Sequence, residues 1–364
     1  MAANGRYLYG VVPAGASKEF GPIGLDGGEV RTVTDGGIGI VASDAERIPF
    51  AEAAPEKTLQ CLAQHQRVLE QVLLGSPVIP LKLGTYADDD GQVLEILRAG
   101  RSEFAGALER YADKVEVDLA ACWADLGSVL AEIAGDDAVI VAKTQIGRPA
   151  QATTAQRIRI GQLVKELLDQ KNQAIAERLL VALRTRWQDI VVNPARDDSA
   201  VLSAAVLIDR RGLAEFDRML EQLDRCYDGR VNFRRVGPLP PYSFATAEVR
   251  TVPAAGLDAA RQTLGLGESA SLAQIKGAYR RLLQEVHPDR NTDPRAAGRL
   301  KDISAAHDLL EEYALHFKHT FRGDQDAPVI VTVRSLEDLR AEAANTSRRR
   351  DPVRRQDSVR AAAA

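Results

Sequence analysis

Strand-like and helix-like stretches alternate along the first third of the chain, which restricts the fold there to a mixture of sheet and helix. Residues 6–12 and 39–42 are short β-branched or aromatic runs separated by a glycine-rich stretch, as expected of strands joined by loops. Apolar residues then recur at helical spacing in residues 58–74, and a Gly-Ser-Pro sequence ends that helix. The alternation predicts a small α/β domain. Its remaining elements are a strand at 78–83, a helix at 91–111 and a strand at 115–122.

A second α/β unit follows a connector. Residues 124–155 contain a possible helix, an apolar run and a polar Gly/Pro-containing stretch, so we place a domain boundary there. Residues 155–187 contain no proline and are rich in good helix formers, which predicts one long helix or a closely spaced pair. The unit ends at residues 237–241, Gly-Pro-Leu-Pro-Pro, a stiff segment with few backbone donors. Between these come strands at 190–192 and 201–208, a helix at 212–226 and a strand at 230–236.

Composition limits the class of protein. With 364 residues, 45% of them hydrophobic, the chain can form two or three domains. A net charge of -4 gives no overall attraction to nucleic acid or to an anionic membrane. No apolar run approaches the roughly 20 residues of a membrane-spanning helix, and residues 7–12 are too short for a signal peptide. The three cysteines are far apart, so we expect buried thiols in a cytoplasmic protein: Cys61, Cys122 and Cys226.

Three motifs in the first two units have a familiar order and spacing. They are residues 7–12 (Tyr-Leu-Tyr-Gly-Val-Val), 77–85 (Pro-Val-Ile-Pro-Leu-Lys-Leu-Gly-Thr) and 237–244 (Gly-Pro-Leu-Pro-Pro-Tyr-Ser-Phe). Together with a strand at 202–209 and a following helix, they resemble the gas vesicle protein F/L family over residues 6–248. The chain departs from the family where Lys-Leu-Gly-Thr replaces the usual Arg-Phe-Gly-Thr, and where residues 115–123 only loosely match a tryptophan-containing strand.

The resemblance implies two ferredoxin-like or related α/β domains that bind the hydrophobic vesicle shell protein or other vesicle accessory proteins. It implies no catalytic activity and no cofactor. For single residues, packing is the competing interpretation, because alternating tyrosines fit the faces of a strand and prolines fit a rigid domain edge. The residues that the resemblance marks for partner binding are Tyr7, Tyr9, Lys82, Gly84, Pro240, Pro241, Tyr242 and Phe244.

The strongest local signal is His287-Pro288-Asp289, which lies between two amphipathic helices. Apolar residues recur at spacings of three and four on both sides, which predicts two helices packed as an antiparallel hairpin. Ser271 and Gln274 form a capping box at the start of the first helix. The two stripes are Leu272, Ile275, Tyr279, Leu282 and Val286 before the tripeptide, and Leu300, Ile303, His307 and Leu310 after it.

This pattern resembles the J-domain of Hsp40-type co-chaperones over residues 257–315. The resemblance implies that His287, Pro288 and Asp289 contact an Hsp70 (DnaK-type) chaperone and stimulate its ATP hydrolysis. It also implies a basic helix face, formed by Lys276, Arg280 and Arg281. Glu285 adds negative charge near the tripeptide, and His307 replaces the family's tyrosine; we expect His307 to be a hydrogen-bonded core residue. No zinc-binding cysteine repeats follow, so a dedicated client is expected.

The sequence gives little support for an enzyme, a metal site or a nucleic-acid-binding protein. The chain has no phosphate-binding loop, metal-binding HExxH helix or nucleophile elbow, so we predict neither an enzyme nor a metal site. His65 lacks a convincing catalytic partner, and His316 and His319 are a pair without a nearby carboxylate. The arginine clusters near the C-terminus lack interleaved aromatics, which favours a solvated tail or protein contact over nucleic acid.

The prediction is an α+β chain of two ferredoxin-like or related α/β domains with a long helical segment, followed by an all-α J-domain hairpin. Its predicted function is to assist gas vesicle assembly by binding the vesicle shell protein or other accessory proteins and by recruiting and stimulating Hsp70. We expect it in the cytoplasm and at the gas vesicle, without nucleic acid or membrane. The alternative is a J-protein co-chaperone or adaptor for unrelated clients. The expected parts are 1–124 and 155–248 (α/β domains), 125–154 (connector), 249–256 (linker), 257–316 (J-domain) and 317–364 (tail, largely disordered).

Overall fold

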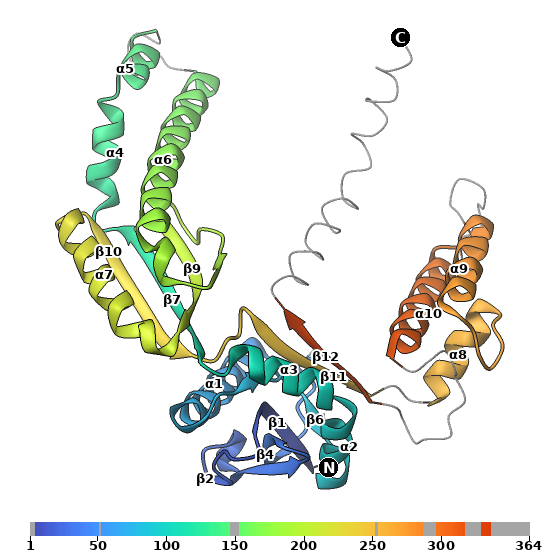
Figure 1. The fold of residues 1–364 in the computed structure, drawn as a ribbon. Coiled ribbons are helices and arrows are strands. Elements are labelled where there is room, and N and C mark those ends of the chain that lie inside the picture. The colour runs from blue at the N-terminus through green and yellow to red at the C-terminus, as the bar shows by residue number, and fades with distance from the viewer. Residues whose placement is uncertain are drawn as a thin grey trace. The chain divides into compact units, whose positions relative to one another are not determined.

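The computed structural model describes residues 4–50, 52–145, 153–251, 254–286, 296–316 and 329–335. These residues fall into two compact units, drawn in Figure 1. The first unit takes its described residues from 1–65, 81–106 and 247–333, and the second from 66–80, 107–246 and 334–364. The mixed α/β class and the helical C-terminal domain that the sequence predicts are confirmed.

A six-stranded sheet is the frame of the first unit. Its strand order is β2-β3-β4-β1-β5, and β6 also pairs with β1. The long central strand β1 runs antiparallel to β4, with Tyr7 opposite Ser43 and a bulge between Leu8 and Gly10. The strands are β1 Asn4–Pro13, β2 Glu19–Gly21, β3 Val30–Asp35, β4 Ile38–Glu46, β5 Ile79–Pro80 and β6 Tyr86–Ala87, with the short turn η1 Leu25–Gly27 after β2.

Three helices follow or interrupt these strands: α1 Pro55–Gly75, α2 Asp90–Ala99 and α3 Arg101–Tyr111. The sequence predicted one helix over 91–111, and this was wrong at Gly100, where α2 ends. A Cβ atom at this position would lie 2.6 Å from Val331 Cγ1 and 2.7 Å from Phe104 Cε2. The close approach of these two side chains explains why glycine occupies the break.

The second unit contains a four-stranded antiparallel sheet of order β10-β7-β9-β8. The sequence assigned residues 115–122 to the first predicted domain, but β7 is an inner strand of this second sheet. Its alternate residues from Val117 to Trp123 are buried in the core of the second unit, which explains the pairing. The strands are β7 Lys114–Trp123, β8 Asp189–Val192, β9 Ala200–Asp209 and β10 Val231–Leu239. β10 extends into the predicted stiff segment as far as Leu239, with a cis bond at Gly237-Pro238.

Helices cover one face of this sheet and extend beyond it (Figure 1). The long helix predicted near 155–187 is confirmed as a single helix, which starts with a capping box between Thr153 and Gln156. Asn172 joins it to the sheet, because Trp123 Nε1 donates to Asn172 Oδ1 at 2.6 Å. The elements are α4 Leu126–Ala134, α5 Asp137–Thr144, α6 Thr154–Leu183, η3 Arg184–Arg186, η4 Arg210–Gly212 and α7 Leu213–Tyr227.

The expectation of three buried thiols is correct only for Cys61. Cys122 is half-buried, because it lies on the face of β7 away from the helices, and Cys226 is exposed at the end of α7. No helix in the described part of the chain is long and apolar enough to cross a bilayer.

The C-terminal helices α8 Ala254–Leu264, α9 Leu272–Val286 and α10 Ala296–His316 share one core. Both predicted apolar stripes lie in it or against it, and His307 is 8% exposed. The predicted capping box is confirmed: Ser271 N donates to Gln274 Oε1 at 2.8 Å and Gln274 N to Ser271 Oγ at 3.3 Å. Gly265 ends α8 in the left-handed conformation that favours glycine (φ 65°).

Two strands flank these helices in the sequence and pair with each other: β11 Ala245–Thr251 and β12 Val329–Ser335. The predicted linker 249–256 therefore holds the end of β11 and the start of α8. Residues 329–335 were expected in a largely disordered tail, but they form β12, because their β-branched residues are buried. The arginine clusters further on lie outside the described residues.

The core of the second unit yields a direct test on α6. Leu179 is fully buried, so Leu179→Ala should lower the free energy of unfolding by about 2–5 kcal/mol through lost burial and a cavity. The matched change Val181→Ala, at a side chain 76% exposed on the same helix, should cost less than about 0.5 kcal/mol. Urea unfolding followed by tryptophan fluorescence measures both, since both tryptophans, Trp123 and Trp187, lie in this unit. Equal losses would contradict the packing of α6.

Candidate functional site

The Tyr-Leu-Tyr motif of β1 lies in the core of the first unit. Tyr7 and Tyr9 are fully buried, with ring centroids 4.9 Å apart. The Tyr7 hydroxyl lies 2.9 Å from His65 Nδ1 and accepts from Gly84 N at 3.4 Å. The Tyr9 hydroxyl lies 2.9 Å from Ser43 Oγ and accepts from Leu25 N at 2.8 Å. Burial raises the pKa of both tyrosines, so both hydroxyls stay neutral.

His65 of α1 completes this cluster, and the sequence analysis did not identify it. Its side chain is 2% exposed, and burial lowers its pKa to about 4, against the opposing effect of a hydrogen bond with the Leu81 backbone. The ring is therefore neutral at pH 7, and Nδ1 accepts the Tyr7 hydroxyl proton. Its spacing from Cys61 and Val68 places it on the buried face of α1, which is the sequence signal that could have found it.

The Lys-Leu-Gly-Thr motif makes a tight turn that returns the chain to β1. Gly84 has a φ of 84°, and a Cβ there would lie 2.8 Å from Phe50, so glycine is required. Thr85 Oγ1 donates to the Lys82 carbonyl at 2.6 Å. The Lys82 side chain itself is 61% exposed, with Nζ 3.1 Å from Glu248 Oε1. Of this motif, Lys82 is thus the exposed residue, and its ammonium group pairs with Glu248.

The Pro-Pro-Tyr-Ser-Phe motif is held by a buried carboxylate in the second unit. Glu116 of β7 is 3% exposed; its Oε2 accepts from Ser243 N at 2.7 Å and its Oε1 from Ser243 Oγ at 2.8 Å. Burial raises the pKa of Glu116 to about 7, although both hydrogen bonds from Ser243 act in the opposite direction. The Tyr111 hydroxyl also donates to the Phe244 carbonyl at 3.0 Å.

The predicted partner-binding residues of this motif are mostly inside the molecule. Pro240, Pro241 and Phe244 are buried, and Tyr242 is half-buried. The Tyr242 hydroxyl is buried, has no hydrogen-bond partner among the described residues, and has its pKa raised by burial. Together with the buried Tyr7 and Tyr9, these side chains stabilise the two units, and in this conformation they do not present a contact surface.

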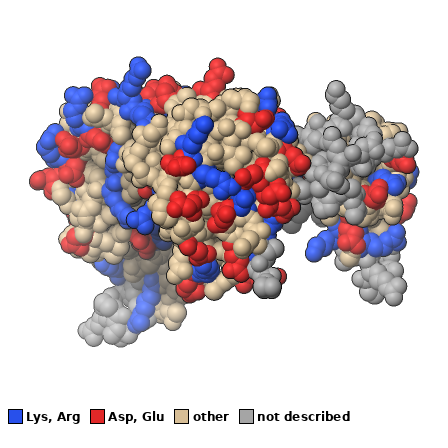
Figure 2. Space-filling view, turned by 90° about the horizontal axis from the view of Figure 1, so that it is seen from below, with Lys and Arg blue, Asp and Glu red and all other residues tan. Residues whose placement is uncertain are grey.

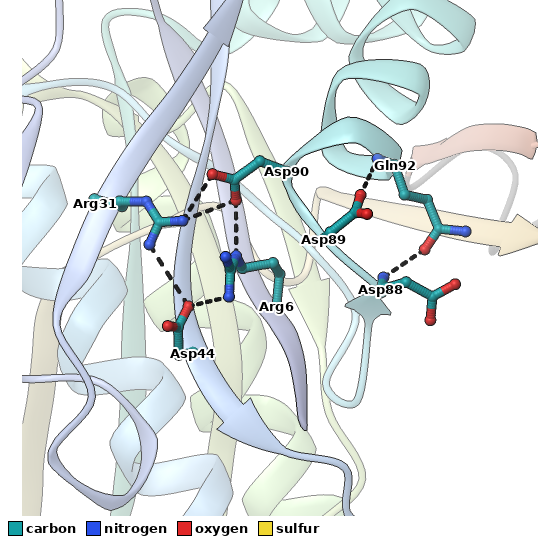
Figure 3. Close-up of polar contacts among 7 residues, drawn as sticks. All are labelled: Arg6, Arg31, Asp44, Asp88, Asp89, Asp90 and Gln92. Carbon is teal, nitrogen blue, oxygen red and sulfur yellow. Dashed lines mark hydrogen bonds and ion pairs between the residues drawn. The ribbon is translucent and has the colours of Figure 1, made fainter. Parts of the chain in front are cut away.

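A charged network that the sequence analysis did not single out fixes the start of α2 (Figure 3). Asp90 accepts from Arg31 Nη2 at 2.8 Å and from Arg6 Nε at 2.7 Å, and Asp44 pairs with both arginines. Burial alone would raise the pKa of Asp90, but the two arginines outweigh it and lower that pKa. Because arginines satisfy these carboxylates, the network joins β1, β3 and β4 to α2.

Charges of both signs are mixed over the face shown in Figure 2, which fits the small net charge of -4. Among the described residues, no group of three or more His, Cys, Asp or Glu side chains could hold a metal ion. The side chains of His316 and His319 lie outside the described residues. The described residues therefore form a stable frame with exposed surfaces that could bind another protein.

The helical domain carries the predicted basic face on α9. Lys276, Arg280 and Arg281 are all exposed, and Lys276 Nζ lies 2.8 Å from Glu311 Oε1 of α10. His287, Pro288 and Asp289 lie outside the described residues, in the connection between α9 and α10. Glu285 is exposed on the last turn of α9.

His307 occupies the core position expected of it. It stacks on Tyr279 with ring centroids 4.1 Å apart, and its Nδ1 lies 3.1 Å from Asp308 Oδ1. This confirms the expectation of a buried, hydrogen-bonded histidine that fills the place of an aromatic ring.

Comparison with known proteins assigns the two parts of the chain separately. A family model described as "Gas vesicle synthesis protein GvpL/GvpF" matches residues 5–246. "Gas vesicle protein F" of Streptomyces sp. (strain CB03234) is 27% identical over 243 residues, which cover 65% of this chain and 98% of that protein. The crystal structure of the gas vesicle protein GvpF from Anabaena sp. PCC7120 covers 66% of this chain and 97% of its own, with a TM-score of 0.57 at 21% identity. This structural likeness concerns the fold.

The helical part matches a different family. A model described as "DnaJ domain" matches residues 262–314. "Chaperone protein dnaJ A7B, chloroplastic" of Oryza sativa subsp. japonica is 48% identical over 50 residues, which cover 14% of this chain and 11% of that protein. The likeness to this chaperone is therefore confined to one domain.

Glu116 gives a pH-dependent prediction. Because its folded pKa of about 7 exceeds its ordinary value of 4.5, its contribution to stability is complete below pH 4.5 and is lost as pH rises to 7. Glu116→Gln removes this titration. The difference in unfolding free energy between wild type and variant should therefore change by about 3 kcal/mol over this range. Urea unfolding at several pH values measures it, and parallel pH curves would contradict the raised pKa.

Proposed function

Because the chain belongs to the gas vesicle synthesis protein GvpL/GvpF family and contains a DnaJ domain, we propose that it brings an Hsp70 chaperone to vesicle proteins during assembly. In this role it has no catalytic chemistry of its own. It works in the cytoplasm and at the growing vesicle, and its partners are the shell protein or other vesicle accessory proteins and a DnaK-type Hsp70.

The observation that carries the proposal is the presence of both modules in one chain. The family region spans 5–246, and its two sheets each have a helix-covered core. The J-domain helices have a separate core that includes Leu257, Ile275 and Leu310. A client-binding part and a chaperone-recruiting part on one chain raise the effective concentration of Hsp70 at the client.

On the chaperone side, we assign the stimulation of ATP hydrolysis by Hsp70 to His287, Pro288 and Asp289. The exposed Arg280 and Arg281 add electrostatic steering towards an acidic Hsp70 surface, whereas Lys276 is already paired with Glu311. Steering by exposed charges weakens as salt screens them, so the stimulation should fall with ionic strength.

On the client side, we assign binding of the vesicle protein to surface residues, because most motif residues are buried. A hydrophobic shell protein needs exposed apolar area, and α5 and α6 supply it in Ile140 (45% exposed), Val141 (53%) and Ile158 (56%). A groove of about 700 Å³ between these helices includes Val141, Ile160 and Leu163 in its lining. Lys82 is the exposed residue of the family motifs that adds a polar contact.

The test is steady-state ATP hydrolysis by the cognate Hsp70, with wild-type protein or His287→Gln, each with and without shell protein. Wild-type protein should stimulate hydrolysis, shell protein should increase the stimulation, and the variant should return the rate to the basal value. Gln284→Ala, at an exposed position on the last turn of α9, is the matched control and should keep the stimulation.

Two results would contradict the proposal in different ways. Equal rates with wild type and His287→Gln would remove the co-chaperone role. Stimulation that is indifferent to shell protein, together with no co-purification of the two proteins, would favour an adaptor for unrelated clients.

A further inference from the structure

The strands β11 and β12 form a two-stranded sheet, which one isolated bridge links to the first sheet. Leu81 N donates to the Tyr9 carbonyl of β1 at 2.9 Å, and Leu81 forms a parallel bridge with Ala247 of β11. Lys82 N donates to the Ala247 carbonyl at 2.9 Å. β12 pairs with β11 in the same two-stranded sheet. Figure 1 shows β11 and β12 side by side.

β12 fits its position through β-branched side chains. Val329, Ile330 and Val331 are 7%, 1% and 3% exposed. Val331 reaches the break between α2 and α3, where a Cβ on Gly100 would lie 2.6 Å from its Cγ1. Phe104, which is fully buried, borders the same space. The hollow at Gly100 and Phe104 therefore accepts an aliphatic side chain from β12.

This strand lies outside both regions that the comparisons match, 5–246 and 262–314. The family match ends at residue 246, so it also takes in only the first two residues of β11. Without β12, the edge of β11 would present unpaired backbone N–H and C=O groups next to an apolar hollow. Such an edge is a template for another strand.

We propose that the edge of β11 and the hollow at Gly100 and Phe104 form a strand-acceptor site, which residues 329–335 fill from within the chain and which an extended, β-branched segment of a partner protein occupies by displacing them. Main-chain hydrogen bonds supply affinity for any extended segment, and the hollow selects an uncharged aliphatic side chain. The inference is independent of the Hsp70 role.

Displacement has a consequence for the J-domain. Its helices lie between β11 and β12 in the sequence, so the chain enters and leaves this domain through the paired strands. A partner strand that replaces β12 removes one of these two attachments and takes Ile330 out of the core that it shares with the J-domain helices. The site thus links occupation by a partner segment to the freedom of the J-domain.

The experiment measures binding of a labelled peptide, Val-Ile-Val-Thr-Val-Arg-Ser (residues 329–335), to the full chain by fluorescence anisotropy. Val331→Asp places a charge in the hollow and should release the internal strand. The peptide should then bind on the order of 100-fold more tightly than to wild type, where the tethered strand competes at high effective concentration. The same peptide with aspartate at its third position should not bind.

Glycine variants supply the matched controls. Gly100→Ala added to Val331→Asp fills the hollow and should abolish peptide binding, whereas Gly106→Ala should not, since a Cβ at Gly106 meets nothing within 4 Å. Equal binding to wild type, Val331→Asp and the Gly100→Ala double variant would overturn the proposal. Absence of binding to a folded Val331→Asp chain would overturn it as well.

Wild-type protein gives a second measurement that needs no variant. Excess peptide should accelerate amide hydrogen exchange in residues 329–335 without changing exchange in β1 or β4. Unchanged exchange in residues 329–335 at millimolar peptide would show that the strand is a permanent part of the sheet, and the proposal would fail.

Discussion

The need to satisfy two buried tyrosine hydroxyls organises the first unit. Tyr7 and Tyr9 have no exposed surface, so their hydroxyls require partners inside the protein. These partners come from His65 of α1, Ser43 of β4, Leu25 and the turn at Gly84. Beside that turn, Leu81 bonds to Tyr9 of β1 and bridges to Ala247, which links β1 to the separate strand pair of β11 and β12. The two strands that flank the J-domain helices in the sequence are therefore connected to β1 through Leu81.

In the second unit, a buried carboxylate likewise needs hydrogen-bond partners inside the protein. Glu116 is buried on β7, and its two oxygens hold the backbone and side chain of Ser243. The family motifs thus contribute buried polar contacts that join distant segments, and the surfaces left for partners are elsewhere. This separation leaves exposed residues such as Lys82 and Ile158 outside the buried contacts that hold the frame.

Periodicity in the sequence predicted most helices and strands, because each apolar stripe in residues 58–74 or 272–286 is a local property of the chain. It failed where the outcome depends on distant partners. The place of β7 in the second sheet, the helix break at Gly100 beside Val331 and the pairing of β12 with β11 all require contacts between residues far apart in sequence. The motif residues were assigned to partner binding as a set, with packing as the alternative for single residues, and the burial of most of them agrees with packing. His65 was missed because its hydrogen-bond partner, Tyr7, lies 58 residues away.

We propose to count vesicles in cells in order to test whether this one chain connects gas vesicle assembly to Hsp70. A gas-vesicle-forming host that lacks this chain would be supplied with wild type or with His287→Gln at equal protein levels, and vesicles counted by pressure-sensitive light scattering. Wild type should restore vesicles, and the variant should restore clearly fewer. Full restoration by the variant would show that the family region alone suffices, and the link to Hsp70 would fail.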